Sequence, residues 1–295
     1  MADAALDLDA AARPVAAPHS HRRRGPMRWV VMALLVVLLI GTLFPFFLAL
    51  INAIKPDVDY NSGGPLSLPS ALDFSALVKF WGLADYTRKL ANSVIISACV
   101  AVFGVVVSLL NAYAIGVGKV RGARALLVIA MLGIMVPQES IIYPLYYMAK
   151  ATGLYDTQLS VIVIFSVIQS AFGTYLLSAV LGSFPREIIE AAEIDGANRW
   201  QVLWFVVVPV LRPTLMVVGT FFFIWTWNEF LIPLVLLVSN DNQTVSVAMG
   251  LTRGQNMPQP TLLAAASLLG IAPTVLFFLL FQRTLTRGVV VGAVK

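Results

Sequence analysis

Long apolar runs separated by shorter polar segments extend over most of the chain. A helix needs about 20 apolar residues to cross the hydrocarbon core of a bilayer, and six runs approach this length. They lie at residues 29–51, 93–117, 126–148, 159–181, 215–238 and 262–281. The pattern predicts an all-α polytopic membrane protein in which six transmembrane helices form one domain over 28–282.

The composition favours a membrane protein over a soluble one. Of the 295 residues, 59% are hydrophobic and 12% are charged, whereas soluble domains average about 45–50% and about 25%. This excess of apolar residues is too large for a soluble core of this length. The single cysteine, Cys99, lies inside an apolar run, which excludes a disulfide framework.

The positions of the Lys and Arg residues predict the orientation of the chain. With the N-terminus in the cytoplasm, the segments on that side hold 14 of the 20 Lys and Arg residues. Because cytoplasmic loops carry the excess of positive charge, both termini are expected in the cytoplasm, with a C-terminal tail over 283–295. Residues 1–27 are expected to be a disordered tail. The first apolar run is too long for a signal-peptide core and is expected to stay as a span.

The longest segment expected outside the membrane covers residues 52–89. It contains "NSGGPLSLPS", a composition typical of loops. A plain connecting loop and a docking surface are both consistent with it.

The polar segment 182–212 is expected to be a structured cytoplasmic loop. Within it, "FPREIIEAAEIDG" predicts a short helix that begins near Pro185 and ends at Gly196, since proline suits the first turn of a helix and glycine its end. Arg186 and Glu190 are spaced to pair at i,i+4, and Glu187 is favourable near the N-terminal end of the helix.

A second helix is predicted from "ANRWQVLWFVVVP". Pro209 and Pro213 are expected to break it where the fifth span begins. Taken alone, the loop fits either an amphipathic connector at the membrane interface or a docking element for a cytoplasmic partner. Alanines beside Ile188 would allow such a partner to approach closely.

The order of residues in the loop favours docking. "EAA", then "DGA" after two residues, then a proline twelve residues further on, resembles the cytoplasmic signature of the membrane subunits of binding-protein-dependent ABC importers. The matching residues are Glu190, Ala191, Ala192, Asp195, Gly196, Ala197 and Pro209. Segments 141–163, 227–237 and 281–295 resemble the sugar-importing branch, in particular the shorter permease of the maltose and oligosaccharide type.

This resemblance, which extends from about residue 29 to the end, implies a type I ABC importer permease in a bacterial cytoplasmic (inner) membrane. It implies a heterodimer with a second permease, two ATPase subunits and an external sugar-binding protein. The helix at 190–197 would then couple to the ATPase, and the tail from Arg283 would reach toward the ATPase pair. ATP and Mg would be used by the ATPase, and this chain would bind no cofactor.

The chain is not expected to be an enzyme. "GVGKVRG" at residue 116 lacks the spacing and the Ser or Thr of a P-loop. The two histidines, His19 and His21, both lie in the predicted N-terminal tail, so no metal site or His-based catalytic site is expected.

Candidates for the translocation path are the polar and aromatic residues in or near the spans. Acidic residues near a membrane span are functional candidates by default, amide groups can hydrogen-bond to sugar hydroxyls, and sugars stack on aromatic rings. The principal candidates are Glu229, Asn228, Glu139, Tyr143 and Trp225. Further polar and aromatic candidates are Gln138, Gln169, Ser170, Tyr146, Tyr147, Phe222 and Trp227. The aromatic residues are equally consistent with lipid-facing or interfacial positions.

Two other functions remain alternatives. An ABC importer permease for a non-sugar solute would share the DGA-containing loop. A self-sufficient secondary transporter would instead show charged relays in its spans and inverted repeats in its two halves, neither of which is clear in the sequence.

Overall fold

The structure is a computed structural model that describes residues 27–118, 120–255 and 259–293. The predicted N-terminal tail, with His19 and His21, lies outside the described residues except for Met27. Helices account for most of the described residues, and no strand is found among them. The elements are α1 (Met27–Ala53), α2 (Asp57–Gly63), α3 (Ser75–Leu83), α4 (Tyr86–Gly116), α5 (Ala123–Met135), α6 (Gln138–Ala151), α7 (Gln158–Gly182), α8 (Arg186–Ile194), α9 (Arg199–Gln201), the π-helix η2 (Val202–Val207), α10 (Val208–Asn228), α11 (Leu231–Leu236), the 3₁₀-helix η3 (Asn240–Asn242), α12 (Val245–Gln255) and α13 (Pro260–Ala293).

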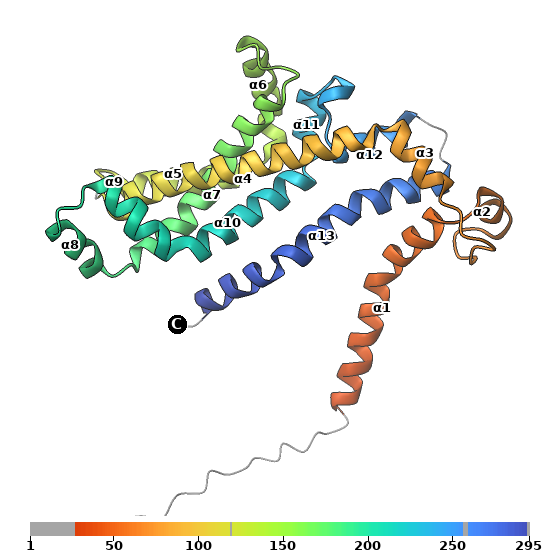
Figure 1. Ribbon diagram of the computed structural model, residues 1–295, viewed down its shortest axis with the longest axis horizontal. Coiled ribbons are helices and arrows are strands. Elements are labelled where there is room, and N and C mark those ends of the chain that lie inside the picture. The colour runs from red at the N-terminus through yellow and green to blue at the C-terminus, as the bar shows by residue number, and fades with distance from the viewer. Residues whose placement is uncertain (1–26, 119, 256–258, 294–295) are drawn as a thin grey trace, which may run out of the picture. The chain divides into compact units, whose positions relative to one another are not determined.

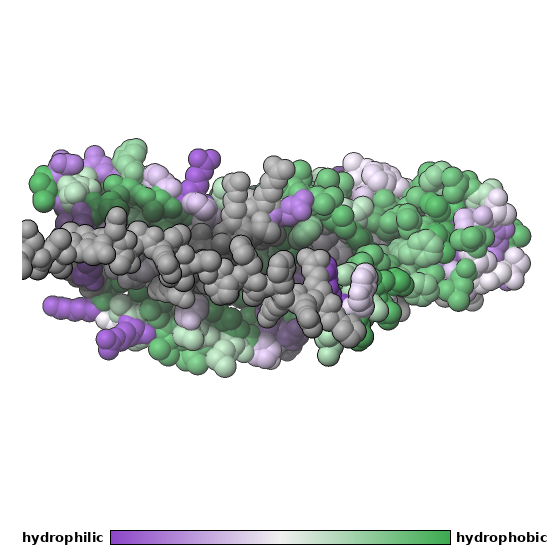
Figure 2. Space-filling view, turned by 90° about the horizontal axis from the view of Figure 1, so that it is seen from below, coloured by the Kyte–Doolittle hydropathy of each residue, from purple (hydrophilic) through white to green (hydrophobic). Residues whose placement is uncertain are grey.

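The structure confirms the prediction of a helical membrane protein. Five helical stretches are long and apolar enough to span a bilayer, and a sixth candidate is the bent pair α5 and α6. Figure 2 shows that apolar residues cover much of the visible surface. A soluble protein could not leave so much apolar side-chain area in water.

The first apolar run forms α1. Its residues 27–45 belong to a compact unit of their own, which ends at Pro45, and every one of these side chains is exposed. A helix that is apolar on all sides needs lipid or another protein around it.

The remaining unit, Phe46–Lys295, is built around α4, α7 and α10, which pack along one another (Figure 1). They come close together at Gly173, where an added Cβ would lie 2.2 Å from Ser108 Oγ and 2.9 Å from the Phe222 ring. Gly104 lies against the same ring, with a Cβ position 2.8 Å from it. These glycines therefore let a large aromatic side chain fill the junction of three helices.

The third apolar run, predicted as a span over 126–148, is divided between α5 and α6. The chain bends by 98° between α5 and α6. Pro137 lies at the break and lacks the N–H that a continuous helix would use. It also favours extended backbone at the preceding Val136, whose ψ is 122°.

The predicted limits of the fifth span, residues 215–238, are wrong. Helical structure runs without interruption from Arg199 to Asn228, and the chain is extended at Glu229. Pro209 and Pro213 do not break this stretch. The π-turn η2 comes directly before them, and such a turn is a common way to accommodate a disturbed hydrogen-bond ladder in a long helix.

The segments outside the predicted spans contain more structure than expected. Helices α2 and α3 lie within 52–89, α4 begins at Tyr86 rather than at 93, and α12 follows α11. Helix α13 continues to Ala293, so the C-terminal tail predicted from 283 begins inside a helix. Helices α3 and α12 each bury some of their side chains, but they are too short to be detected by a search for long apolar runs.

Candidate functional site

The loop between α7 and α10 is a helix, a glycine turn and a second helix, as the sequence predicts. Helix α8 begins after Pro185, which is its N-cap residue. It ends at a turn in which Gly196 has a φ of +85° and in which Ala197 N donates to Ala192 O at 3.0 Å. Only glycine adopts this left-handed conformation without strain.

The second helix is fixed by a capping box. Asn198 Oδ1 accepts hydrogen bonds from Trp200 N and Gln201 N, both at 3.0 Å. In return, Asn198 N donates to Gln201 Oε1 at 2.8 Å. Both unpaired donors at this helix end are therefore satisfied locally, and the direction of the chain after Gly196 is set before it enters η2.

Helix α8 divides its side chains between the protein and the surface. Ile189 is buried in a cluster with Leu203 and Leu211, and Ala192 and Ala197 pack against the same cluster. The residues of the predicted coupling motif that stay exposed are Glu190, Ala191, Asp195 and Gly196. The loop thus presents a small-residue surface with two carboxylates on a rigid support.

One detail of the loop differs from the expectations. Arg186 and Glu190 form no ion pair; the ion pair found within the described residues is Arg88–Asp241. Ile188 remains 43% exposed and is left on the surface of α8. A small cavity of about 140 Å³ separates α8 from the ends of α4 and α7, with Arg186, Glu190 and Glu193 in its lining.

The loop is tied to the rest of the helical unit at the C-terminal end of α4. Tyr113 Oη donates to Arg199 O at 3.0 Å, and Leu109 and Ala112 of α4 share the core that buries Ile189. A displacement of α8 would therefore disturb the packing of α4, α7 and α10 together.

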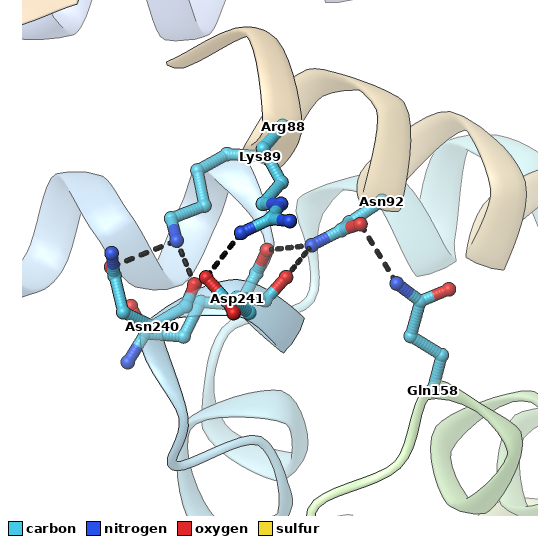
Figure 3. Close-up of polar contacts among 7 residues, drawn as sticks. Arg88, Lys89, Asn92, Gln158, Asn240 and Asp241 are labelled. Atoms are coloured by element: carbon cyan, nitrogen blue, oxygen red, sulfur yellow. Dashed lines mark hydrogen bonds and ion pairs between the residues drawn. The ribbon is translucent and has the colours of Figure 1, made fainter. Parts of the chain in front are cut away.

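The opposite end of α4 carries a network of polar contacts (Figure 3). Lys89 is 1% exposed; its Nζ donates to both Asn240 O and Asn240 Oδ1. Asn92 Nδ2 donates to Asp241 O at 2.7 Å and to Gln243 O at 2.9 Å. Gln158 Nε2 donates to Asn92 Oδ1 at 2.7 Å. The turn at 239–243 is therefore held against α4 and the start of α7.

Asp156 attaches the same turn from the loop before α7. It has a φ of +60°, and its carboxylate accepts hydrogen bonds from Ser239 N and Ser239 Oγ. Burial alone would raise the pKa of Asp156, but hydrogen bonds from Ser239 and Asn242 hold this pKa below its ordinary value. Sequence inspection missed Asp156, Lys89 and Asn92, because their partners are distant in the chain.

The predicted path residues fall into two groups at this end of the unit. Trp225, Asn228 and Glu229 lie at the C-terminal end of α10, where Glu229 Oε1 accepts a hydrogen bond from Leu231 N at 3.3 Å. Glu139 and Tyr143 lie one turn apart on α6. The two groups are joined because α6 and α11 share an apolar core.

The side chains of these candidates differ in their surroundings. Asn228 lines a cavity. Trp225 instead contacts the rings of Phe172, Phe221 and Phe222. Of the further candidates, Gln169 Nε2 donates to Thr226 Oγ1 at 2.9 Å, deep between α7 and α10.

Helix α6 carries a row of tyrosines. Tyr143 Oη lies 3.0 Å from Tyr147 Oη, and Tyr146 contacts both Tyr147 and Tyr155 edge to face. Lys150 Nζ lies 4.8 Å and 5.0 Å from the ring centroids of Tyr146 and Tyr155. These rings support one another on the side of α6 that does not pack against α11.

The architecture defines a class of protein: a multi-pass helical membrane protein with a rigid, exposed loop between two spans. Residues 115–291 match the family described as binding-protein-dependent transport system inner membrane component. The chain belongs to this family, and the resemblance on which the sequence analysis relied is confirmed.

Several curated relatives cover nearly the whole chain. The trehalose transport system permease protein of Mycobacterium tuberculosis is 31% identical over 90% of this chain and 97% of its own length. The diacetylchitobiose uptake system permease protein of Streptomyces coelicolor is 29% identical over 88% of this chain and 94% of its own. The lactose transport system permease protein of Rhizobium radiobacter is 27% identical over 93% and 98%.

A solved structure shows the same fold. A chain from the crystal structure of a bacterial ABC transporter involved in the import of the acidic polysaccharide alginate superposes with a TM-score of 0.76. It is 24% identical in sequence and covers 87% of this chain and 95% of its own. The family and the curated relatives identify the chain as an inner-membrane permease subunit.

Proposed function

We propose that the chain is one of two permeases in an ATP-driven ABC importer for a di- or oligosaccharide. A second, homologous permease completes the translocation path, and an external binding protein delivers the sugar. Two ATPase subunits bind and hydrolyse ATP with Mg. The observation that carries the sugar specificity is the set of near full-length relatives whose names specify sugar transport.

The α7–α10 loop supports an ATPase partner. The side chains of Glu190 and Asp195 in this loop are exposed, and the side chain of Ile189 is buried. It is built directly onto the ends of the spans that would move during transport. This is the arrangement needed to convert a push on α8 into motion of α4, α7 and α10, and it favours a coupling element over a passive interfacial connector.

The charge distribution supports a cytoplasmic position for this loop. Arg186, Arg199 and Arg212 lie in or beside it, and cytoplasmic segments are rich in Lys and Arg. Both termini then lie in the cytoplasm, and the polar network around Lys89 and Asp156 faces outward, where the binding protein would release its sugar.

Uptake of labelled sugars tests this function. Cells that express the complete importer operon, and matched cells that lack only this chain, are given trehalose, lactose, melibiose and diacetylchitobiose in turn. The proposal predicts ATP-dependent accumulation of at least one of these sugars that requires this chain. Accumulation of none of them, together with uptake of a non-sugar solute, would favour the alternative importer. Uptake that persists without an ATPase would favour a secondary transporter.

A further inference from the structure

An open cavity of about 450 Å³ lies between the C-terminal end of α10, α12 and α13. Pockets for small organic molecules measure about 300–1,000 Å³ and are mainly apolar, with a few polar groups that orient the ligand. Polar groups come from Asn228, Ser246 and Thr274, and the large apolar side chains of the lining are Phe46, Trp227, Phe230, Val245, Met249, Ile271 and Val275.

The polar groups retain hydrogen-bonding capacity. Asn228 Nδ2 donates to Ile224 O at 2.7 Å, which leaves its Oδ1 and one N–H for a ligand. Ser246 Oγ donates to Trp227 O at 3.0 Å, which leaves the acceptor lone pairs of Ser246. Thr274 hydroxyl makes no hydrogen bond to any part of the chain that the structure describes.

The cavity is built into the packing of α12 on α13. An added Cβ at Gly270 would lie 2.1 Å from Met249 Sδ, so a larger residue at Gly270 would force this lining side chain to move. Gly250 similarly lies against the Phe230 ring, with a Cβ position 2.4 Å from it. Two lining side chains are therefore held in place by glycines on the facing helices.

A pyranose ring has apolar C–H faces and a rim of hydroxyl groups. A mainly apolar lining that includes aromatic side chains, with three polar groups that keep hydrogen-bonding capacity, matches this chemistry. A hydrocarbon chain would make no hydrogen bond to these polar groups. We propose that this cavity is a binding subsite for one pyranose unit of the transported sugar. The inference rests on the proposed function and assigns Ser246, Met249 and Thr274 to sugar contact, beyond the sequence candidates.

Protection of a cysteine from labelling tests the subsite. Cys99 is the single cysteine of the chain, so a Cys99→Ser background allows one new thiol, Ser246→Cys, to be followed on the tagged chain. The complete importer, with its binding protein, is treated with a small thiol reagent with and without the sugar that the uptake experiment identifies. With the sugar at ten times its apparent Kd, labelling should slow about ten-fold.

Matched variants separate contact from a general conformational change. The native Val238 side chain is 57% exposed and lies outside the cavity. The sugar should therefore leave the labelling rate of Val238→Cys unchanged. Thr274→Val should weaken the protection of Ser246→Cys. Ser267→Ala on the same helix, whose hydroxyl is bonded to Leu263 O, should not.

Each outcome bears on one of the two proposals. If sugar is taken up but the labelling of Ser246→Cys is the same with and without it, the subsite is wrong and the importer function stands. Protection by lauryl-chain detergent and not by sugar would identify an acyl-chain site and also overturn the inference. If no sugar of the panel is taken up, the proposed function itself fails.

Discussion

Gly196 turns the chain between α8 and α9 with a φ of +85°. A residue with a Cβ in this conformation costs roughly 1–2 kcal/mol, and a β-branched residue costs more. We expect Gly196→Val to distort the turn and to lower sugar uptake severalfold, because Asp195 and Glu190 are then presented differently to the ATPase. The amount of ATPase recovered with the tagged chain should fall in parallel.

Gly182→Val is the matched control for this substitution. Neither glycine has any atom within 4 Å of an added Cβ, and they differ in that Gly196 has a positive φ. Normal uptake and normal ATPase recovery with Gly196→Val would show that the turn plays no part in coupling.

Asp156 makes the attachment of the 239–243 turn sensitive to acid. Its folded-state pKa lies below the ordinary value of 3.8, because hydrogen bonds from Ser239 and Asn242 outweigh the effect of burial. The stability that the carboxylate contributes is therefore complete above the ordinary pKa and is lost as the pH falls through the lower, folded-state pKa. Asp156→Asn should lower the melting temperature of the purified chain at neutral pH and have a progressively smaller effect in acid.

Ser239→Ala provides a second route to the same contact. It removes the side-chain hydrogen bond to Asp156, so its effect on the melting temperature should shrink over the same acidic range. An effect of Asp156→Asn that stays constant down to the lowest pH would contradict this role of the carboxylate.

Lys89 attaches the 239–243 turn to α4. Its ammonium group is buried and bonded to Asn240 O and Asn240 Oδ1, and loss of a partner leaves a buried polar group unsatisfied at a cost of about 1–3 kcal/mol. Lys89→Met should therefore increase hydrogen exchange at 239–243. Lys79→Met, at an exposed lysine that bonds to Gln259, should leave exchange at this turn unchanged.

Among the elements, the bend between α5 and α6 has the clearest local cause. Pro137 supplies no N–H at the break, so Pro137→Ala should allow α5 and α6 to straighten in part. Spin labels at positions 126 and 147 would be about 32 Å apart along a single straight helix and closer when the pair is bent by 98°. The variant should therefore show longer distances in pulsed electron paramagnetic resonance.

Pro144 is the control for this experiment. It lies inside α6 without breaking the helix, so Pro144→Ala should leave the distance unchanged. The bend would have another cause, such as the packing of α6 on α11, if Pro137→Ala kept the wild-type distance.

A comparison of the predicted and observed helices shows which of them follow from local sequence patterns. Long apolar runs identified α1 and α7 closely and found the central parts of α4 and α13, because about 20 apolar residues have few alternatives to a span. Local rules predicted α8 and the turn at Gly196. The segment "ANRWQ" also contains the capping box of Asn198 and Gln201, which the sequence prediction did not include. The contrast between Pro137, where the chain bends, and Pro209, which stays within a helical stretch, was not predictable. A proline can end, bend or enter a helix according to the surrounding packing.

Contacts between residues distant in the chain could not be predicted from the sequence for a different reason. The cavity joins Asn228, Ser246 and Thr274 from three helices, and the network of Lys89 joins residues about 150 positions apart. No local pattern marks such partners. The path candidates Glu139, Glu229 and Tyr143 stay predictions, now placed on α6 and at the end of α10.

At the scale of the whole molecule, the large exposed apolar surface of the described residues determines which partners the chain needs. Residues 27–45 of α1 have no buried side chain, and α5 has none either. Lipid covers some of this surface, and a second permease is the proposed cover for the remainder. Both the partner permease and the ATPase must then be present for the chain to act in transport.

A pull-down in gentle detergent tests whether the chain works in a complex of this kind. The tagged chain is purified from its native membrane and the co-purifying proteins are identified by mass spectrometry. The proposed importer predicts an ATPase and a second six-span permease in stoichiometric amounts. Glu190→Lys and Asp195→Lys on the α8 surface should reduce recovery of the ATPase and leave the second permease bound. Recovery of the chain alone, still active in transport after reconstitution, would contradict the proposed importer.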